Sequence, residues 1–391
     1  MNVLPPLALY IHVPWCVRKC PYCDFNSHGV GVNAELPETA YVDALITDLE
    51  SEVPLAAGRP LSSIFVGGGT PSLLSADAYR RLLTAIEARL GFANDIEITL
   101  EANPGTVERG RFEGFREAGI NRLSLGIQSF NDHQLKALGR IHSGAEAMGA
   151  VTAARAAGFD NFNLDLMHGL PGQRVEDALE DLDCALSLGP EHLSWYQLTL
   201  EPNTEFYSHP PALPVEETLF DIQDEGLARL SAGGLERYEI SAYARHPERR
   251  AWHNLNYWQF GDYLGIGAGA HGKVTLASDD GISISRRWKS RQPDAYLRRY
   301  NDPRGFLAGS REISPDERSL EFLMNALRLV EGVDTELWPE RTGLSLARLH
   351  QYLKPACERG LVTLGDSVKT TPRGLEFLND VLALCDIQLD D

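Results

Sequence analysis

Three of the six cysteines in this chain lie close together, at Cys16, Cys20 and Cys23. Their spacing is C-x3-C-x2-C, and they follow a short apolar run of strand character. Thiolate sulfur is a good ligand for iron, and a short loop can bring three thiolates to one side of an iron–sulfur cluster. A [4Fe-4S] cubane has four irons, so three cysteines leave one iron open to a non-protein ligand.

Zinc is the alternative metal for these thiols. Zinc usually takes four nitrogen or sulfur ligands, and the nearest candidates for the fourth are His12 and His28. The remaining cysteines, Cys184, Cys357 and Cys385, are scattered through helical patterns. We expect those three to be small buried residues.

A second candidate segment is rich in glycine. The sequence FVGGGTPS follows another apolar run and contains Gly68, Gly69 and Thr70. Because glycine has no Cβ, backbone N–H groups can approach a ligand closely there. The alternative is a tight turn between a strand and a helix, and the glycines alone do not decide between the two.

Polar side chains follow further apolar runs, namely Glu101 in LEANP, Gln128 in GIQSF, Arg140 in LGRIH and Asp165 in NLDLMHG. A carboxylate can accept hydrogen bonds from ribose hydroxyls or an ammonium group, and a guanidinium can pair with a carboxylate. Each of these residues could instead cap a helix or join neighbouring strands. Together they predict a ligand site where the runs end.

The elements that must position these residues alternate along the first 245 residues. Strands are predicted at 7–13, 63–68, 95–102, 122–128, 161–169, 192–200 and 235–244, and helices at 38–53, 75–90, 107–118, 143–157, 174–188 and 215–233. Such alternation predicts parallel strands with helices outside, as a barrel or an open sheet. In a barrel the ligand binds at the carboxyl ends of the strands, where the cysteines and the glycine segment fall.

The pattern changes in the last third of the chain. Residues 246–310 read as a strand pair with glycine-rich turns. Residues 311–391 read as helices, with two short strands around a turn at Gly365-Asp366, an order similar to a winged-helix fold. Residues 311–391 are not strongly basic, so we expect them to have a structural or partner-docking role rather than to bind DNA.

Composition excludes several classes of protein. The net charge of -19 argues against broad contact with nucleic acid, which needs a basic face. The first residues lack the basic start and long apolar run of a signal peptide, and no apolar stretch is long enough to span a membrane. We expect a cytosolic protein, in which thiols stay reduced and clustered cysteines bind metal rather than form disulfides.

The cysteine spacing after a first strand resembles the radical S-adenosylmethionine (SAM) superfamily. The resemblance implies a partial (β/α) TIM-like barrel, a [4Fe-4S] cluster on Cys16, Cys20 and Cys23, and SAM on the open iron. The segments YIHVPWC, FVGGGTPS, LEANPGT, RLSLGIQSFND, LGRIH and NLDLMHGLPGQ are similar to oxygen-independent coproporphyrinogen III dehydrogenase and its relatives. That likeness implies SAM contacts at Tyr10, Tyr22, Gly68, Gly69, Thr70, Glu101, Gln128, Arg140 and Asp165. No catalytic residue is predicted.

Within that group, Phe25 separates two families. The dehydrogenase has a fourth cysteine at this place, whereas the related heme chaperones have phenylalanine. The segment His253 to Trp258 also matches the H-N-x-x-Y-W heme motif of the chaperones. An imidazole can ligate heme iron and aromatic rings can cover a porphyrin, so we expect heme b at His253, Tyr257 and Trp258.

The choice of iron ligand stays open, because His271 and Tyr257 are further candidates. The resemblance to the chaperones implies delivery of heme to acceptor hemoproteins, membrane-associated respiratory enzymes among them, and allows a homodimer. The alternative function is the oxidative decarboxylation of coproporphyrinogen III. Whether the chain acts as an enzyme is left open by the sequence.

Overall fold

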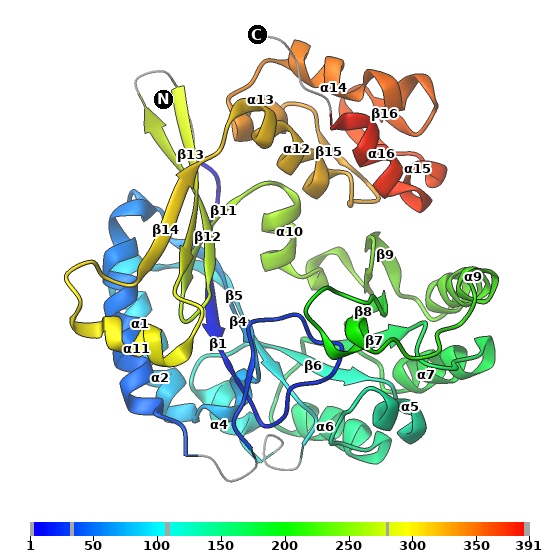
Figure 1. The fold of residues 1–391 in the computed structure, drawn as a ribbon, viewed down its shortest axis with the longest axis horizontal. Coiled ribbons are helices and arrows are strands. Elements are labelled where there is room, and N and C mark those ends of the chain that lie inside the picture. The colour runs from blue at the N-terminus through cyan, green and yellow to red at the C-terminus, as the bar shows by residue number, and fades with distance from the viewer. Residues whose placement is uncertain (1–3, 32–34, 106–109, 279–280, 387–391) are drawn as a thin grey trace.

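A computed structural model describes residues 4–31, 35–105, 110–278 and 281–386 of the chain (Figure 1). Its centre is a 12-stranded sheet in the order β14-β13-β12-β11-β1-β4-β5-β6-β7-β8-β10-β9. The strands are β1 (Leu7–Val13), β4 (Leu61–Gly68), β5 (Phe92–Ala102), β6 (Arg122–Gln128), β7 (Phe162–His168), β8 (His192–Gln197), β9 (Glu236–Glu239), β10 (Ala242–Ala244), β11 (Asp262–Ile266), β12 (His271–Ser278), β13 (Gly281–Lys289) and β14 (Leu307–Glu312).

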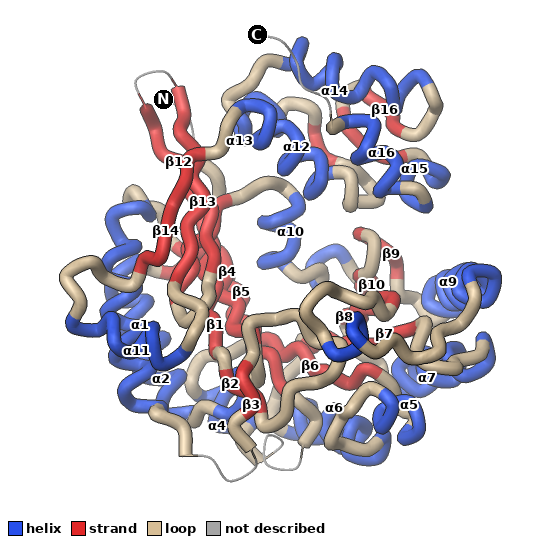
Figure 2. Tube along the Cα trace, viewed as in Figure 1, coloured by secondary structure: helices blue, strands red, loops and turns tan. Residues whose placement is uncertain are grey.

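The strands from β1 to β8 in this sheet are joined by parallel ladders. Helices cover their outer face, as Figure 2 shows. They are α1 (Glu38–Glu52), α2 (Ala76–Leu90), α4 (Phe112–Glu117), α5 (Asp132–Ala137), α6 (Gly144–Ala156), α7 (Val175–Ser187) and α9 (Glu216–Ala232). The predicted alternation and parallel sheet are confirmed.

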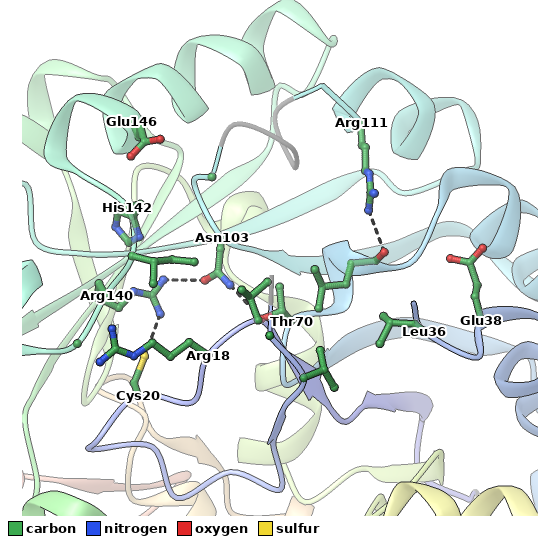
Figure 3. Close-up of a pocket in the computed structure, with 17 residues that line it drawn as sticks. Arg18, Cys20, Leu36, Glu38, Thr70, Asn103, Arg111, Arg140, His142 and Glu146 are labelled. Atoms are coloured by element: carbon green, nitrogen blue, oxygen red, sulfur yellow. Dashed lines mark hydrogen bonds between the residues drawn. The ribbon is translucent and has the colours of Figure 1, made fainter. Parts of the chain in front are cut away.

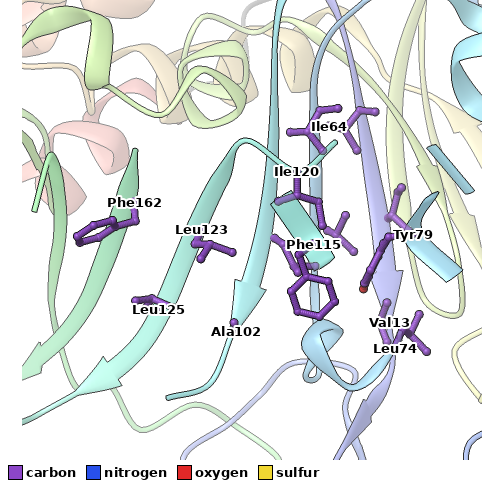
Figure 4. Close-up of a cluster of buried hydrophobic side chains, with 14 of the residues drawn as sticks. Val13, Ile64, Leu74, Tyr79, Ala102, Phe115, Ile120, Leu123, Leu125 and Phe162 are labelled. Atoms are coloured by element: carbon purple, nitrogen blue, oxygen red, sulfur yellow. The ribbon is translucent and has the colours of Figure 1, made fainter. Parts of the chain in front are cut away.

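One buried apolar cluster holds these two layers together (Figure 4). It joins Ile64, Leu123 and Phe162 of the strands to Tyr79 and Phe115 of the outer helices. Along β6 (RLSLGIQ) and β7 (FNLDLMH), the apolar residues that pack into this cluster recur at every second position and alternate mainly with polar residues on the other face of the sheet. This is why the strand positions were readable from the sequence.

Two predicted elements differ from the structure. The expected single strand over 235–244 is a hairpin of the antiparallel strands β9 and β10, because the Glu239 side chain accepts hydrogen bonds from the Ser241 backbone N–H and hydroxyl and stabilises a turn. The expected helix over 107–118 is shorter, since α4 begins at Phe112, and residues 107–109 lie outside the described part. Short helices α5, α8 (Glu205–Ser208), α10 (Trp252–Trp258) and α11 (Pro293–Arg298) were not predicted.

The strand pair expected after residue 245 is the antiparallel hairpin of β12 and β13. It continues the large sheet, because β11 pairs in parallel with β1. The sheet therefore runs across residue 245, and the division of the chain at residues 245 and 310 stays a prediction.

The C-terminal region packs helices on the small sheet β15-β17-β16. Its elements are α12 (Pro315–Ala326), β15 (Val333–Asp334), α13 (Leu337–Thr342), α14 (Leu346–Glu358), β16 (Val362–Leu364), β17 (Ser367–Thr370), α15 (Pro372–Glu376) and α16 (Leu378–Cys385). The predicted order of helix, strand, turn, strand and helix is confirmed. Figure 1 shows α10 between this region and the large sheet. Among the described helices, none combines the length and apolar composition that a membrane crossing requires.

A buried ionic cluster fixes the strand extension to the first helix of the barrel. Lys289 at the end of β13 lies 2.6 Å from both Asp48 Oδ1 and Glu52 Oε1 of α1. The Tyr296 hydroxyl donates to Asp48 Oδ2 at 2.7 Å. Burial raises the pKa of Asp48, and the adjacent ammonium group opposes that rise.

We expect Lys289→Met to lower the free energy of unfolding by about 3–5 kcal/mol, because the buried Asp48 loses its cation and Glu52 keeps only Arg287. Urea denaturation at pH 7 measures the loss, which should shrink at acid pH because the raised pKa of Asp48 lets that carboxylate take up a proton. Arg229→Met is the control, since the pair of Arg229 and Asp183 is exposed to solvent and should contribute little to stability. Equal losses in both variants would contradict a role for the buried cluster.

Candidate cofactor site

The three clustered cysteines lie on the loop that follows β1. Strands β2 (Trp15–Cys16) and β3 (His28–Gly29) pair in parallel and close this loop at its base. Within it, the Cys23 N–H donates to the carbonyl oxygen of Cys20 at 3.1 Å. All three side chains line one cavity of about 330 Å³. The structure therefore brings together the thiols that the sequence predicted to act together.

The chemistry of this donor set fits an iron–sulfur cluster. Burial raises the pKa of the Cys16 and Cys23 thiols, so binding as thiolates requires positive charge such as that of iron. Among the described residues, no three His, Cys, Asp or Glu side chains gather as they would around a single metal ion. Three thiolates that bind different irons of one cubane do not have to meet at one point.

The glycine segment lies against the cysteine loop because it has no side chains there. The Gly69 N–H donates to Val13 O and the Thr70 N–H to Trp15 O, both at 2.7 Å. A Cβ at Gly69 would lie 2.5 Å from Trp15 O. Gly68 has a φ of 116°, and a Cβ there would meet the His12 ring at 2.5 Å. The close backbone approach predicted for the glycine segment is therefore an approach to the cysteine loop. Gly68, Gly69 and Thr70 also line the cavity.

His12, a candidate fourth zinc ligand, faces away from the cavity. Its Nε2 lies 2.9 Å from Asn26 O and its Nδ1 lies 2.9 Å from the Tyr10 hydroxyl. Burial lowers the pKa of His12 to about 4, so the ring is neutral near pH 7. His28 does not line the cavity either, and neither does Tyr10.

The cavity collects the other polar residues that the sequence predicted for SAM. They are Tyr22, Gly68, Gly69, Thr70, Glu101, Gln128, Arg140 and Asp165. Most of them lie in the cysteine loop or at the carboxyl end of a parallel strand, whereas Asp165 lies in the middle of β7 and Arg140 follows α5. The carboxyl ends of the strands form the edge of the sheet where we expected a ligand.

Two buried carboxyl groups make the cavity favourable for a cation. Burial raises the pKa of Glu101 to about 8, with a further rise from the charge of Asp165 and an opposing hydrogen bond from the Gly68 N–H. Burial also raises the pKa of Asp165, against hydrogen bonds at 2.8 Å from Ser124 Oγ and Asn163 Nδ2. A positively charged sulfonium such as that of SAM would favour the ionised form of both groups.

Arg140 connects the cysteine loop to the strand ends (Figure 3). It donates to Asn103 Oδ1 at 2.6 Å and to Gly126 O at 2.7 Å, and its Nη1 lies 3.7 Å from Cys20 Sγ. This contact places positive charge beside a sulfur that would carry negative charge on iron. A neighbouring cavity of about 520 Å³, drawn in Figure 3, shares Arg140 and Cys20 and lacks the other two cysteines.

Sequence reasoning missed two residues of the site. Asn103 donates to Thr70 Oγ1 at 3.0 Å while it accepts from Arg140. The Tyr196 hydroxyl donates to Gln128 Oε1 at 2.8 Å. Asn103 stands in the LEANP segment already singled out for Glu101, so that position carried a signal, whereas Tyr196 lay in the middle of the strand predicted at 192–200 and lies near the end of the observed strand β8.

The histidine of the H-N-x-x-Y-W segment is buried within the protein. His253 on α10 is 1% exposed, with Nδ1 3.1 Å from Ser63 Oγ and Nε2 2.9 Å from the Tyr257 hydroxyl. Its ring stacks on Phe65 at 5.2 Å between centroids. Burial lowers the pKa of His253 to about 3, so the imidazole is neutral. Heme ligation by His253 would require at least one of these contacts, to Ser63 at Nδ1 or to Tyr257 at Nε2, to open.

The other residues predicted for heme, Tyr257, Trp258 and His271, do not all line one cavity. Trp258 lines the cysteine cavity, and together with Tyr257 it lines a further cavity of about 200 Å³. The guanidinium of Arg328 lies 4.3 Å from the centre of a Trp258 ring. His271 is exposed at the start of β12 and lines neither cavity.

Comparison with known proteins identifies the family. The family model for the radical SAM superfamily matches residues 10–185, and the model for the HemN C-terminal domain matches residues 313–377. The chain is 50% identical to the heme chaperone HemW of Escherichia coli, over 98% of this chain and 99% of that protein. The chain belongs to the HemW family. The HemW of Haemophilus influenzae is 48% identical over 98% of the chain and 99% of that protein.

Membership of the HemW family agrees with the fold. The structure of coproporphyrinogen III oxidase (HemN) from E. coli, a radical SAM enzyme, superposes with a TM-score of 0.81 over 99% of this chain and 91% of that chain, at 24% identity. At that identity the likeness establishes the fold alone. Membership of the radical SAM superfamily implies a [4Fe-4S] cluster and SAM, and the donors described above fit both.

We expect each of Cys16→Ala, Cys20→Ala and Cys23→Ala to abolish the broad iron–sulfur absorption of the anaerobically reconstituted protein, because two thiolates hold a cubane poorly. Cys184→Ala is the matched control outside the loop and should keep the absorption. Retention of the cluster in all three loop variants would refute the ligand assignment.

The raised pKa of Glu101 predicts a dependence of stability on pH. The unfolded state releases this proton near pH 4.5 and the folded state near pH 8, so folding becomes less favourable as pH rises through that window. Glu101→Gln should therefore stabilise the cofactor-free protein relative to wild type by about 1–3 kcal/mol at pH 8, and by less at pH 5. Urea denaturation at the two pH values measures this difference. Glu113→Gln, a change at an exposed site, is the control and should not alter how the free energy of unfolding differs between the two pH values. The same change of unfolding free energy with pH in wild type, Glu101→Gln and Glu113→Gln would contradict the raised pKa of Glu101.

Proposed function

We propose that this protein is a heme chaperone that binds heme b and delivers it to acceptor hemoproteins of respiration. It would use a [4Fe-4S] cluster on Cys16, Cys20 and Cys23, with SAM on the remaining iron. The observation that carries the proposal is the 50% identity to the E. coli heme chaperone HemW over nearly the full length of both chains. When bound, the cluster would supply a one-electron reductant and a metal site for SAM.

Phe25 supports a chaperone rather than a dehydrogenase. It lines the cysteine cavity and is 63% exposed, whereas the dehydrogenase carries a further cysteine at the matching place. An exposed aromatic ring beside the cluster loop offers a flat apolar surface for a porphyrin. Trp258 lines the same cavity from α10, so two aromatic side chains face the space around the cluster loop.

For the heme itself we propose contacts at His253, Tyr257 and Trp258, with His271 as a further candidate ligand. A neutral imidazole is a suitable ligand for heme iron. In the structure Tyr257 occupies Nε2 of His253, so heme binding would be accompanied by a movement of α10 or its side chains. We also propose that the protein works in the cytoplasm, because thiols that bind a cluster must stay reduced.

Two measurements test this function. Hemin titration of the anaerobically reconstituted protein should give a Soret band that saturates, and the heme should then pass to an apo-hemoprotein from a respiratory complex. Incubation with coproporphyrinogen III, SAM and a reductant should leave the porphyrinogen unchanged. Formation of protoporphyrinogen IX, or no Soret band at all, would contradict the proposal.

We expect His253→Ala to weaken hemin affinity by about tenfold or more, because an axial ligand to iron is lost. The cluster absorption should stay, since His253 does not line the cysteine cavity. His168→Ala, another buried histidine, is the matched control. Unchanged hemin affinity in His253→Ala would move the ligand elsewhere, and the same titration of His271→Ala would test the next candidate.

A further inference from the structure

Gln128, the last residue of β6, has a left-handed backbone with a φ of 69°. Residues with a side chain rarely adopt this conformation, because the Cβ crowds the following carbonyl group. The pairing of β6 with β7 also shifts register here, between Leu125 and Gln128. The surrounding structure must therefore hold Gln128 in a conformation that its own backbone disfavours.

This conformation directs the Gln128 side chain into the cysteine cavity. Its Oε1 accepts a hydrogen bond from the Tyr196 hydroxyl at 2.8 Å. Its Nε2 has no hydrogen-bond partner within the part of the chain that the structure describes. The amide group is thus fixed on its oxygen side, and its nitrogen is left to donate to a ligand.

A buried carboxylate on α7 holds the two residues that follow Gln128. Asp181 Oδ2 accepts from the Ser129 hydroxyl and Asp181 Oδ1 accepts from the Phe130 N–H, both at 2.7 Å. The Ser129 hydroxyl oxygen accepts in turn from the Asn131 N–H at 3.0 Å. Both oxygens of one side chain therefore fix the turn between β6 and α5.

The position of Asp181 needs an explanation beyond helix packing. It lies on the inward face of α7 with Ala178, Leu182 and Ala185 and is 4% exposed. A carboxylate among apolar side chains is unfavourable unless it is hydrogen-bonded, and within the described residues no cation pairs with it. Burial raises the pKa of Asp181 to about 6, so the group is mainly ionised at neutral pH and both oxygens can accept.

We propose that Asp181 is a positioning residue for SAM, acting through Ser129 and Phe130 to keep Gln128 left-handed and its amide directed into the cavity. The inference rests on the proposed function, because it takes SAM as the ligand of this cavity. Asp181 does not line the cavity itself. It would therefore affect SAM only through the turn that it holds.

The first test compares three variants of the full-length, anaerobically reconstituted protein by equilibrium dialysis against labelled SAM. Asp181→Ala should weaken SAM affinity by at least about fivefold with the iron and sulfide content unchanged. Asp181→Asn should stay within about twofold of wild type, because its carbonyl still accepts from Phe130 N and its amide can donate to Ser129 Oγ. Asp183→Ala, on the outer face of the same helix and paired with Arg229, should match wild type.

A double-variant cycle decides whether Asp181 acts through Gln128. Glycine adopts a positive φ without support, so Asp181→Ala should change SAM affinity by less than about twofold in a Gln128→Gly background. An equal loss in both backgrounds would overturn the inference and leave Asp181 a purely structural residue. If Asp181→Ala does not fold, Ser129→Ala removes one of the two bonds. A loss of affinity in Ser129→Ala that disappears in the Gln128→Gly background supports the inference, and unchanged affinity contradicts it.

The outcome separates this inference from the heme proposal. The dialysis uses SAM and no hemin, so wild-type protein that binds SAM but not hemin contradicts the heme proposal alone. Wild-type protein that holds its cluster and binds hemin but not SAM contradicts the SAM part of the proposed function together with the role of Asp181, and leaves heme binding supported.

Discussion

The pairing of β1 with β4 is the constraint on which the site depends. The two strands are in parallel register up to Val13 and Gly68, and the contact continues past their ends through the hydrogen bonds of Gly69 N to Val13 O and Thr70 N to Trp15 O. The loops that follow the two strands are therefore paired as well. The cysteine loop and the glycine segment are held at van der Waals distance, and only glycine at positions 68 and 69 allows it.

The rest of the sheet completes a cavity whose charges suit the expected ligands. The parallel strands β5, β6 and β7 end at the same edge and bring Glu101, Gln128 and Asp165 to the cysteines. Arg140 lies between the sulfur of Cys20 and the strand ends. Positive charge thus stands beside the cysteine loop, and two carboxyl groups line the same cavity, where a cationic ligand would favour their ionised form.

Much of this arrangement could be predicted from the sequence, for reasons that differ between residues. Apolar residues recur along every parallel strand. The cysteines, glycines and carboxylates near them are of types rarely grouped without a ligand. Tyr10 and His253 show the limit, because their packing depends on contacts between distant segments. The Tyr10 ring stacks on Phe65 of β4, and His253 lies between Ser63 and Tyr257. Asp181 was unreadable for the same reason, since α7 is an ordinary amphipathic helix apart from one inward carboxylate.

The central claim is that three cysteines hold a cubane whose fourth iron is open to SAM. The most direct test is the electron paramagnetic resonance spectrum of the reduced, anaerobically reconstituted protein before and after addition of SAM, with iron and sulfide analysis of the same sample. The account predicts about four iron and four sulfide per chain and a spectrum that shifts when SAM binds the open iron. Zinc in place of iron, or an iron–sulfur spectrum that SAM leaves unchanged, would contradict it.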